Sequence, residues 1–583
     1  MGRPATGAVH VVRVRSRHVT ASGEVREYES RLLRRSYRDG AKVRKETLAN
    51  LSALPEAAVD AIEAVLKGAV LVDAGAGLAV ARSRAHGHVA LVHAAARQLG
   101  FPELLGPACR ERDLAYALVV SRVAAPRTKL ATLAWWDDVT LGADLGIDGA
   151  PRDQVYAAMD WLTGRQDQIE AGLAARHLRE GGIAMFDLSS SWVEGSHCEL
   201  AARGYSRDGK KGTAQIEYGL LTDPGGRPVA VRVFEGNTAD PAAFTQAVEI
   251  VRGKFGISEL VMVGDRGMIT TARIKALREL GGLSWITCLR APAIKKLAED
   301  NGPLQMSLFD DQDLAEISHP DYPGERLIAC RNPALAAERA RKRQDLLAAT
   351  ETLLAKVKDQ VTAGRITDPD KIGIRAGKVI DRYKVAKHFT LDIGPGSFSW
   401  RRHQAAIDAE AALDGIYVIR TPVPASRLGA PGAVAAYKNL SRVERDFRTL
   451  KTGDLDLRPI HHRLEDRVRG HVLICMLAAY LTWHLRAALA PLTYTDEQPP
   501  ARGNPVAPAR RSAAADAKAG AHTSPDGYPV HNFRGLLDHL ATLTRSTITI
   551  GRTSFDKLSD PTPVQRRAFG LIGAPIPLTL TLK

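Results

Sequence analysis

The sequence has few cysteines, and none of them are paired. Its five cysteines stand at positions 109, 198, 288, 330 and 475, without a Cys-x-x-Cys motif. Such scattered cysteines exclude a disulfide framework and a cysteine-based zinc cluster. They are typical of a reduced compartment, so we expect a cytoplasmic location.

Long hydrophobic runs are also missing. The longest apolar stretch, residues 472–483, is too short to span a bilayer and predicts a buried helix. The N-terminus has no apolar segment of the kind found in signal peptides, so we expect none. We find no basic amphipathic helix with an aromatic face, and the sequence therefore predicts no membrane partner.

What the sequence contains in excess is positive charge. Its 80 Lys and Arg residues outnumber 65 Asp and Glu, which gives a net charge of +15 and a pI of about 9.6. Residues 1–50 hold 12 Lys and Arg against 5 acids, a net +7 and about half of the excess. Cationic side chains release counterions when they bind nucleic acid, so this balance favours a polyanionic partner.

At 583 residues the chain is long enough for three or four domains. Residues 1–70 predict a basic β-rich module, with strands over 9–48, a hairpin turn at Arg38-Asp-Gly40 and a helix over 55–67. Residues 71–180 predict a helical region, because apolar residues recur there at spacings of three and four. The clearest helices are expected at 89–99, 111–123, 154–162 and 166–178.

From residue 182 the apolar pattern changes to the period of a strand. Three strand-like runs precede two helix–strand units, at residues 183–188, 215–221, 228–234, 240–255, 259–264, 271–280 and 283–289. The order β-β-β-α-β-α-β is that of an RNase H-like core, in which the first and fourth strands lie side by side. The sequence therefore predicts an α/β fold with an RNase H-like core over residues 181–290 and 411–492.

Residues 291–410 are expected to interrupt this core as an insertion domain. They contain a long charged helix at 333–361 and strand-like runs at 378–383 and 387–391.

The second part of the core begins with a strand at 415–420 and ends with an apolar helix at 464–489, which is expected to pack on the sheet. Residues 493–530 are rich in Pro, Ala, Gly and charge, and they predict a flexible linker. Residues 531–583 predict a short basic C-terminal module.

Three carboxylates could converge on this core. Two apolar runs, Ile-Ala-Met-Phe-Asp187 and Leu-Val-Met-Val-Gly-Asp265, each end in an aspartate. The third acid, Glu444, lies in a predicted helix with Tyr437 seven residues before it and Lys451 seven residues after it. Seven residues are close to two helical turns, so these three side chains are expected on one face.

Such a set of acids can hold two divalent cations. Phosphodiester cleavage needs an activated nucleophile and a stabilised leaving oxygen, and two cations about 4 Å apart supply both. Mg²⁺ prefers oxygen ligands and keeps several waters, so a few carboxylates are enough. We expect two Mg²⁺ ions, replaceable by Mn²⁺, with Asp187 bridging them, Asp265 holding one and Glu444 the other. Each aspartate alone is also typical of a turn or a helix cap, so the prediction depends on their combination.

Three neighbouring residues each allow two interpretations. Arg266 can contact a phosphate or neutralise Asp265 beside it. Lys451 can clamp a phosphate or stabilise a helix C-terminus, and Tyr437 can hydrogen-bond a phosphate or fill the core. The glycine-rich, basic segment 204–212 is expected to be a mobile loop that touches DNA.

These motifs resemble those of the DDE transposases of bacterial insertion sequences. The similar stretches are Phe186-Asp187-Leu-Ser-Ser, Val263-Gly-Asp265-Arg-Gly-Met268 and Tyr437-(2)-Leu440-(3)-Glu444-(6)-Lys451. The nearest clade has a Tyr-Arg-Glu-Lys helix signature and a β-rich insertion before the third acid. One position differs, because Leu440 stands where the signature has an arginine.

The resemblance implies that Asp187, Asp265 and Glu444 carry the catalytic metals, and that Tyr437 and Lys451 touch phosphates of the transposon ends. It implies an enzyme that binds the terminal inverted repeats of its own element, hydrolyses a strand at each end and joins the freed 3′-hydroxyls to target DNA. Its partners would be double-stranded DNA and a second copy of the chain in a synaptic complex at the nucleoid. The N-terminal module and the helical region are expected to recognise the ends.

Three alternatives stay open. An RNase H-like nuclease without strand transfer would use the same three acids. A phosphatase of the haloacid dehalogenase type also starts from a strand-end aspartate, but it needs a second acid where Ser189 stands. A non-catalytic DNA-binding descendant of a transposase is the third, and the presence of all three acids argues against it.

Overall fold

The computed structural model describes residues 7–21, 23–39, 42–69, 78–299, 302–310, 312–501, 503–550 and 553–582. The chain divides into two compact units. The first contains Met1–Ser83 and Arg545–Ser559, and the second contains Arg84–Thr544 and Asp560–Lys583.

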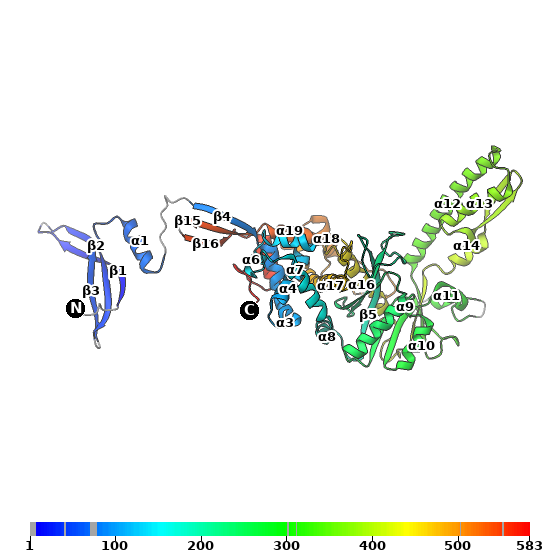
Figure 1. Cartoon of the computed structure of the whole chain (residues 1–583), viewed down its shortest axis with the longest axis horizontal. Helices are drawn as coiled ribbons and strands as arrows, with labels where there is room; N and C mark the ends of the chain where they lie inside the picture. Colours follow the sequence, from blue (N-terminus) through cyan, green and yellow to red (C-terminus); the bar gives the residue numbers. More distant parts are fainter. Residues whose placement is uncertain are drawn as a thin grey trace. The chain divides into compact units, whose positions relative to one another are not determined.

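The first unit begins with the predicted basic β-rich module (Figure 1). Its strands form an antiparallel sheet in the order β1-β2-β3, and a helix follows: β1 (Ala8–Val19), β2 (Val25–Asp39), β3 (Lys42–Asn50) and α1 (Glu56–Leu66). The helix starts after Pro55 and buries Val59 completely. Strands β2 and β3 pair across the predicted hairpin, whose Gly40 lies outside the described residues.

Residues from the C-terminal end of the chain complete the first unit. Two C-terminal strands, β15 (Thr544–Ile550) and β16 (Thr553–Leu558), pair with β4 (Leu78–Ala85) in a sheet of order β16-β15-β4. Two helices from the same part of the sequence, α19 (Phe533–Ala541) and α20 (Pro563–Leu571), pack on α2 (Gly87–Gln98) of the second unit. Residues 531–583 are therefore shared between the two units, which differs from the predicted separate C-terminal module.

The helical region follows the prediction closely. Besides α2 it contains α3 (Phe101–Leu105), α4 (Arg110–Ala124), α5 (Lys129–Trp136), α6 (Thr140–Asp144), α7 (Arg152–Gly164) and α8 (Gln166–His177). Its core includes Trp136, which is fully buried and donates a hydrogen bond to the Ser121 hydroxyl over 2.9 Å.

Within the described residues, eight strands of the second unit form one sheet of order β10-β11-β14-β9-β8-β5-β6-β7. They are β5 (Gly182–Trp192), β6 (Gln215–Thr222), β7 (Pro228–Glu235), β8 (Leu260–Val263), β9 (Leu283–Cys288), β10 (Leu314–Ile317), β11 (Arg326–Arg331) and β14 (Ile416–Thr421). The first three form an antiparallel meander, and β8 and β9 run parallel to β5. The crossovers are α9 (Asp240–Glu249), extended by a π-helical turn η2 (Ile250–Lys254), and α10 (Thr271–Leu280). The predicted β-β-β-α-β-α-β order of elements is therefore present.

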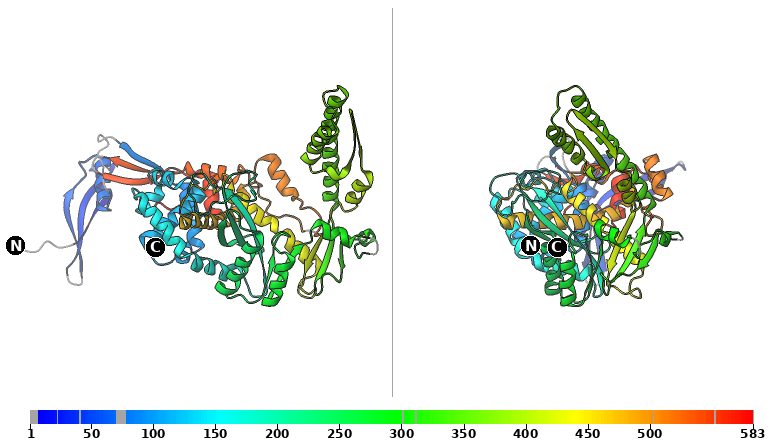
Figure 2. Two further views of the ribbon diagram at one scale, coloured as in Figure 1. Left: turned by 45° about the vertical axis from the view of Figure 1, so that its right-hand side comes forward. Right: turned by 90° about the vertical axis from the view of Figure 1, so that its right-hand side faces the viewer.

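The predicted insertion is smaller than residues 291–410. Its first part supplies β10 and β11 to the main sheet, together with α11 (Ala291–Leu297) and the 3₁₀ turn η3 (Met306–Phe309). The remainder has a hydrophobic core of its own, formed by α12 (Pro333–Thr362), α13 (Pro369–Arg382), the 3₁₀ turn η4 (Ala386–His388), β12 (Phe389–Gly394), β13 (Ser397–Arg402) and α14 (Gln404–Ala411). Figure 2 shows α12 and α13 side by side with the β12–β13 hairpin. Residues 378–382, predicted as a strand, lie in α13, so that prediction is wrong.

The second part of the core contributes three helices, α15 (Ala430–Lys438), α16 (Leu440–Lys451) and α17 (Glu465–Ala488). The last is apolar and long enough to cross a membrane, but 83% of its apolar window is buried inside the protein. It packs on α4, α7 and β7, as expected for a core helix.

The predicted flexible linker, residues 493–530, is a packed part of the second unit. It follows the 3₁₀ turn η5 (Ala490–Leu492) and contains α18 (Ala513–Ala521). Val506 is fully buried, the Asn504 amide donates to Asp313 over 2.6 Å, and the buried Lys518 ammonium donates to Glu497 over 2.8 Å. These long-range contacts order a segment whose composition alone is typical of a linker.

Candidate active site

Asp187 lies inside β5, five residues before its end, and not at the strand terminus that the sequence predicted. The strand is longer because β6 pairs with it as far as Trp192. On the other side, the parallel ladder between β5 and β8 ends at the pair Met185 and Val263. Asp187 therefore stands just beyond the shorter neighbouring strand, where one side of its backbone has no ladder partner.

The second aspartate leaves β8 at the same level. Extending the β5–β8 register by two residues brings Asp265 opposite Asp187. The Asp265 carbonyl accepts hydrogen bonds from the backbone N–H groups of Met268 and Ile269, which forms a tight turn after the strand. The side chains of Asp265 and Arg266 are exposed on this turn.

Glu444 is held over β5 by the packing of α16. The helix buries Val443, Phe447 and Leu450 against the sheet, and the Phe447 ring meets the Tyr218 ring edge-on at 5.7 Å. Apolar residues at spacings of three and four fix this rotation of the helix. Glu444 itself stays exposed at the edge of the packed face.

The predicted single helix carrying Tyr437, Glu444 and Lys451 is interrupted at Asn439. This residue separates α15 from α16, and the Arg442 N–H bonds to its carbonyl three residues back instead of four. Tyr437 consequently belongs to the preceding helix. It contacts the buried Cys288 thiol at the end of β9, and burial raises the Tyr437 pKa well above its ordinary value, with Cys288 and Asp265 adding to the shift.

The electrostatic surroundings of Asp187 include both other acids. Burial is the largest cause that raises the pKa of Asp187 to about 7, and the negative charges of Asp265 and Glu444 raise it further. The Leu188 N–H, which donates to the Asp187 carboxylate over 2.8 Å, and the Arg207 guanidinium act in the opposite direction. A carboxylate that is buried and lies near two other negative charges is stabilised when it binds a cation or a proton.

A cavity of about 400 Å³ opens beside these acids. Its walls include Asp187, Glu444 and four cationic side chains, Arg207, Arg448, Lys451 and Arg458. A polyanion could therefore lie next to the carboxylates with its charge neutralised on several sides.

Two of these cations are already paired with Asp208. The Asp208 carboxylate, only 3% exposed, accepts from the Lys451 ammonium over 2.8 Å and from the Arg458 guanidinium over 2.6 Å. Asp208 belongs to the glycine-rich segment 204–212, and its other oxygen is buried without a hydrogen-bond partner. In this state Lys451 is not free to clamp a phosphate as predicted.

Arg207, the neighbour of Asp208, connects the same loop to β6 and to the start of α9. Its guanidinium pairs with Asp240 over 2.5 Å and with Glu217 over 3.1 Å, and its backbone N–H donates to the Ser190 hydroxyl. Burial raises the pKa of Glu217 to about 7, and Arg207 counteracts that shift. The loop predicted to be mobile is thus fastened on both sides by adjacent residues of opposite charge.

Arg448 is the cavity cation whose side chain has no hydrogen bond or ion pair among the described residues. It lies one helical turn after Glu444, so the two side chains share a face of α16. The sequence interpretation missed Arg207, Asp208, Arg448 and Arg458, and the available signal was the Ser-Arg-Asp run inside the glycine-rich segment.

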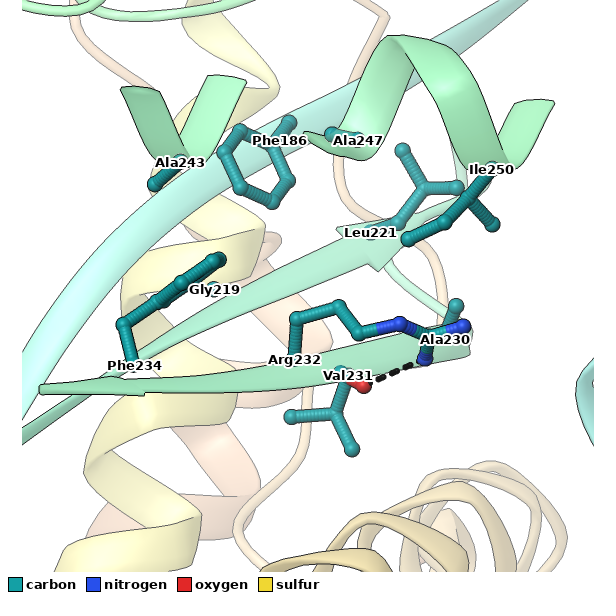
Figure 3. Close-up of a pocket in the computed structure, with 10 residues that line it drawn as sticks. All are labelled: Phe186, Gly219, Leu221, Ala230, Val231, Arg232, Phe234, Ala243, Ala247 and Ile250. Carbon is teal, nitrogen blue, oxygen red and sulfur yellow. Dashed lines mark hydrogen bonds between the residues drawn. The ribbon is translucent and has the colours of Figure 1, made fainter. Parts of the chain in front are cut away.

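A second, much smaller cavity lies between the sheet and α9. There Phe186 points toward Ala243 and Ala247 of α9 (Figure 3), and the apolar cavity between them measures about 10 Å³. Such a space holds at most one water molecule.

The donor chemistry at Asp187 fits a hard divalent cation, because all three candidate ligands are carboxylates. In the parts of the chain that the structure describes, however, no three His, Cys, Asp or Glu side chains are close enough to enclose a metal ion. Asp187, Asp265 and Glu444 would therefore have to move closer together to share a metal.

Two family models match the chain. Residues 186–481 match the family model described as the transposase DDE domain, and residues 17–73 match the N-terminal domain of IS1634 family transposases. Curated proteins give no match. Among solved structures, a cryo-EM structure of the piggyBac transposase synaptic complex with hairpin DNA is similar at 9% identity and a TM-score of 0.33, covering 65% of this chain and 67% of that one.

Proposed function

The chain belongs to the DDE transposases, whose domain model covers about half of it, and we propose that Asp187, Asp265 and Glu444 are its three catalytic acids. As a member of this family the protein is an enzyme that binds DNA and catalyses DNA cleavage and strand transfer with divalent metal ions. The observation that carries the residue assignment is geometric: the β5–β8 register brings Asp265 opposite Asp187, and Glu444 lines the same cavity as Asp187.

We further propose an RNase H-like core for the catalytic domain. The strand order, in which β8 lies between β5 and β9 with a meander on the far side, supports this assignment. In such a core the first and fourth strands lie side by side in the sheet, and extending the β5–β8 register brings Asp265 opposite Asp187.

The metal in the cell is proposed to be Mg²⁺, with Mn²⁺ as a substitute. Asp187 would contribute to both ions, Asp265 to one and Glu444 to the other. Bound there, the ions would activate the attacking water or 3′-hydroxyl and stabilise the leaving oxygen.

The other side chains of the cavity bind and orient the DNA strand. Arg448 meets a phosphate next to the scissile bond through a charge-assisted hydrogen bond. Phosphates can also replace the Asp208 carboxylate on Lys451 and Arg458, which frees both cations for DNA. Tyr437 and Arg266 border the Asp265 side of the site and contact the same strand.

The substrates are proposed to be the terminal inverted repeats of the element that encodes this protein, and then target DNA. Two ends must meet before joining, so a homodimer is the proposed active form. The N-terminal module and the helical region are the proposed end-recognition parts, and the enzyme would act in the cytoplasm at the nucleoid.

The test is a cleavage and joining assay with Mg²⁺ and a plasmid that carries both ends of the element. Glu444→Gln should retain end binding and lose nicking and joining by several orders of magnitude, because the third carboxylate is gone. Asp446→Asn, two residues further on the same helix but facing away from Asp187, is the matched control and should cleave normally.

The outcomes separate the alternatives. Cleavage by the wild-type protein without joined products would favour a nuclease, and no cleavage by either protein would favour a non-catalytic descendant. Nicking by Glu444→Gln at the wild-type rate would disprove the assignment of the third acid.

A further inference from the structure

The sheet of the N-terminal module has two chemically different faces. In an antiparallel sheet, alternate residues point to opposite faces, and directly paired residues share a face. The register of β1, β2 and β3 therefore assigns every strand residue to a face. We call them the paired face and the unpaired face.

Five arginines of the paired face form ion pairs. Each of its strand arginines named here lies within 4 Å of a carboxylate: Arg13 with Asp60, Arg15 with Glu29, Arg17 with Glu27, Arg31 with Glu56, and Arg35 with Glu46. The acids come from the same face of the sheet and from α1, which ion-pairs on this side. The charges of these five arginines are therefore compensated within the protein.

The unpaired face has no acidic residue on its three strands. It presents Arg34 and Arg38 of β2 and Lys45 of β3. None of these three side chains has a hydrogen bond or ion pair among the described residues. Arg26, at the far end of the same face, is paired with Glu24 of the neighbouring turn.

The three free cations form a cluster with hydroxyl groups between them. Arg34 pairs with His10 on one side and Thr47 on the other, and Ser36 pairs with Lys45 in the next row of the ladder. Hydroxyls and cations at this spacing are the side chains that contact DNA phosphates. On the same face, Val43 is paired with Arg38 and is 62% exposed, and Tyr28, further along β2, is 51% exposed.

We propose that the unpaired face of the β1–β3 sheet is a binding surface for the backbone of double-stranded DNA. The inference rests on the proposed function, since it names the face through which the N-terminal module holds the DNA. The sheet lies against the duplex with Arg34, Arg38 and Lys45 on phosphates.

A second copy of the chain is a poorer occupant of this face. A twofold symmetric contact would place the same cationic surface against itself, with no carboxylate on either side to compensate. Duplex DNA offers a continuous row of negative charges and gains entropy from the counterions that binding releases.

The test compares two full-length triple variants that each remove three positive charges. Arg34→Gln/Arg38→Gln/Lys45→Gln changes the unpaired face, and Arg15→Gln/Arg17→Gln/Arg35→Gln changes the paired face of the same sheet. Fluorescence anisotropy measures the Kd for a duplex of the terminal inverted repeat and for a scrambled duplex over a range of salt concentrations. The slope of log Kd against log salt should fall by about 2.7 for the first variant, at about 0.9 for each phosphate contact, and by less than 1 for the second.

Further measurements keep the outcome decisive. Thermal unfolding checks that both variants fold, and Arg34→Lys/Arg38→Lys/Lys45→Arg, which keeps the charges, should keep the wild-type slope. Equal slopes for the two glutamine variants, or a change in oligomeric mass by light scattering without a change in slope, would overturn the inference.

This result is independent of the catalytic assignment. If the unpaired-face variant binds normally while Glu444→Gln still abolishes cleavage, the surface is wrong and the active site stands. If the salt slope falls while Glu444→Gln cleaves normally, the DNA-binding surface stands and the catalytic assignment of Glu444 is wrong.

Discussion

At the scale of single residues, Arg448 is the exposed cation among those that line the active-site cavity. Replacing it with alanine removes a charge-assisted hydrogen bond to a phosphate, which is worth about 1.5–3 kcal/mol. We therefore expect Arg448→Ala to slow single-turnover cleavage by about one to two orders of magnitude.

The matched control is Arg445→Ala on the same helix, since Arg445 is also exposed but does not line the cavity. It should stay within about twofold of the wild type. Equal losses in both variants would mean that α16 acts through its overall charge and not through Arg448.

At the same scale, Asp446 is expected to make the stability of the protein depend on pH. Burial raises its pKa to about 8, and one of its carboxylate oxygens is buried without a hydrogen-bond partner. Because the folded pKa lies above the unfolded value of 3.8, the folded protein holds an extra proton between about pH 4 and pH 8. Native stability therefore gains from this group as the pH falls through that window, and the charged form destabilises the protein above pH 8.

We expect Asp446→Asn to be more stable than the wild type above pH 8, with a difference that shrinks toward pH 4. The change is at most about 1.4 kcal/mol per pH unit. Denaturant unfolding of both proteins at several pH values measures it, and a constant difference across pH 4–9 would contradict the prediction.

At the scale of elements, one buried ion pair fastens the 204–212 loop to α16. The side chains of Asp208 and Lys451 are 3% and 10% exposed, and Arg458 shares the same carboxylate oxygen. Asp208→Asn would leave two buried or half-buried cations without a counter-charge. Removing one partner of such a pair costs about 3 kcal/mol.

We expect Asp208→Asn to lower the free energy of unfolding by that amount and to expose the loop to proteolysis near its glycines. Glu279→Gln is the control, since its pair with Lys275 is 67% and 83% exposed and is worth less than about 1 kcal/mol. Intact loop protection in Asp208→Asn would show that other contacts hold the loop.

The elements also show where the sequence pattern succeeds and where it fails. The meander and both crossovers were predicted within a few residues, because their apolar periods are regular. Residues 378–382 contain β-branched Val379 and Ile380 and were predicted as a strand, but they form part of α13. There the apolar side chains pack on the core of the insertion with α12, and this tertiary packing outweighs local propensity.

At the scale of the whole molecule, the insertion built from α12, α13, β12, β13 and α14 is a separable part. It has its own hydrophobic core, centred on side chains such as Leu347, Leu354 and Ile372. Its two ends meet, since the Asn332 N–H donates to the Gly415 carbonyl over 2.9 Å. The flanking strands β11 and β14 pair directly.

We therefore expect that excising residues 333–414 and joining Asn332 to Gly415 through a short glycine linker leaves a folded protein. Circular dichroism and calorimetry should show one cooperative transition for the main core within a few degrees of its wild-type midpoint. An insoluble product or a missing transition would mean that the main sheet depends on the insertion.

The sequence alone determined the order of elements, the family resemblance and the proposal of three catalytic acids. These features depend on local periodicity and short motifs, which nearby residues carry. Asp187, Asp265 and Glu444 could be named because each follows or lies within a regular apolar pattern.

Only the tertiary structure decided which charges are free and which are neutralised. Asp208 lies more than 240 residues before Lys451, and no local pattern reveals that they pair. The same holds for the packed segment 493–530, which long-range contacts order, and for the two faces of the N-terminal sheet, which register separates. Electrostatic pairing and burial depend on distances in space, and chain composition does not specify those distances.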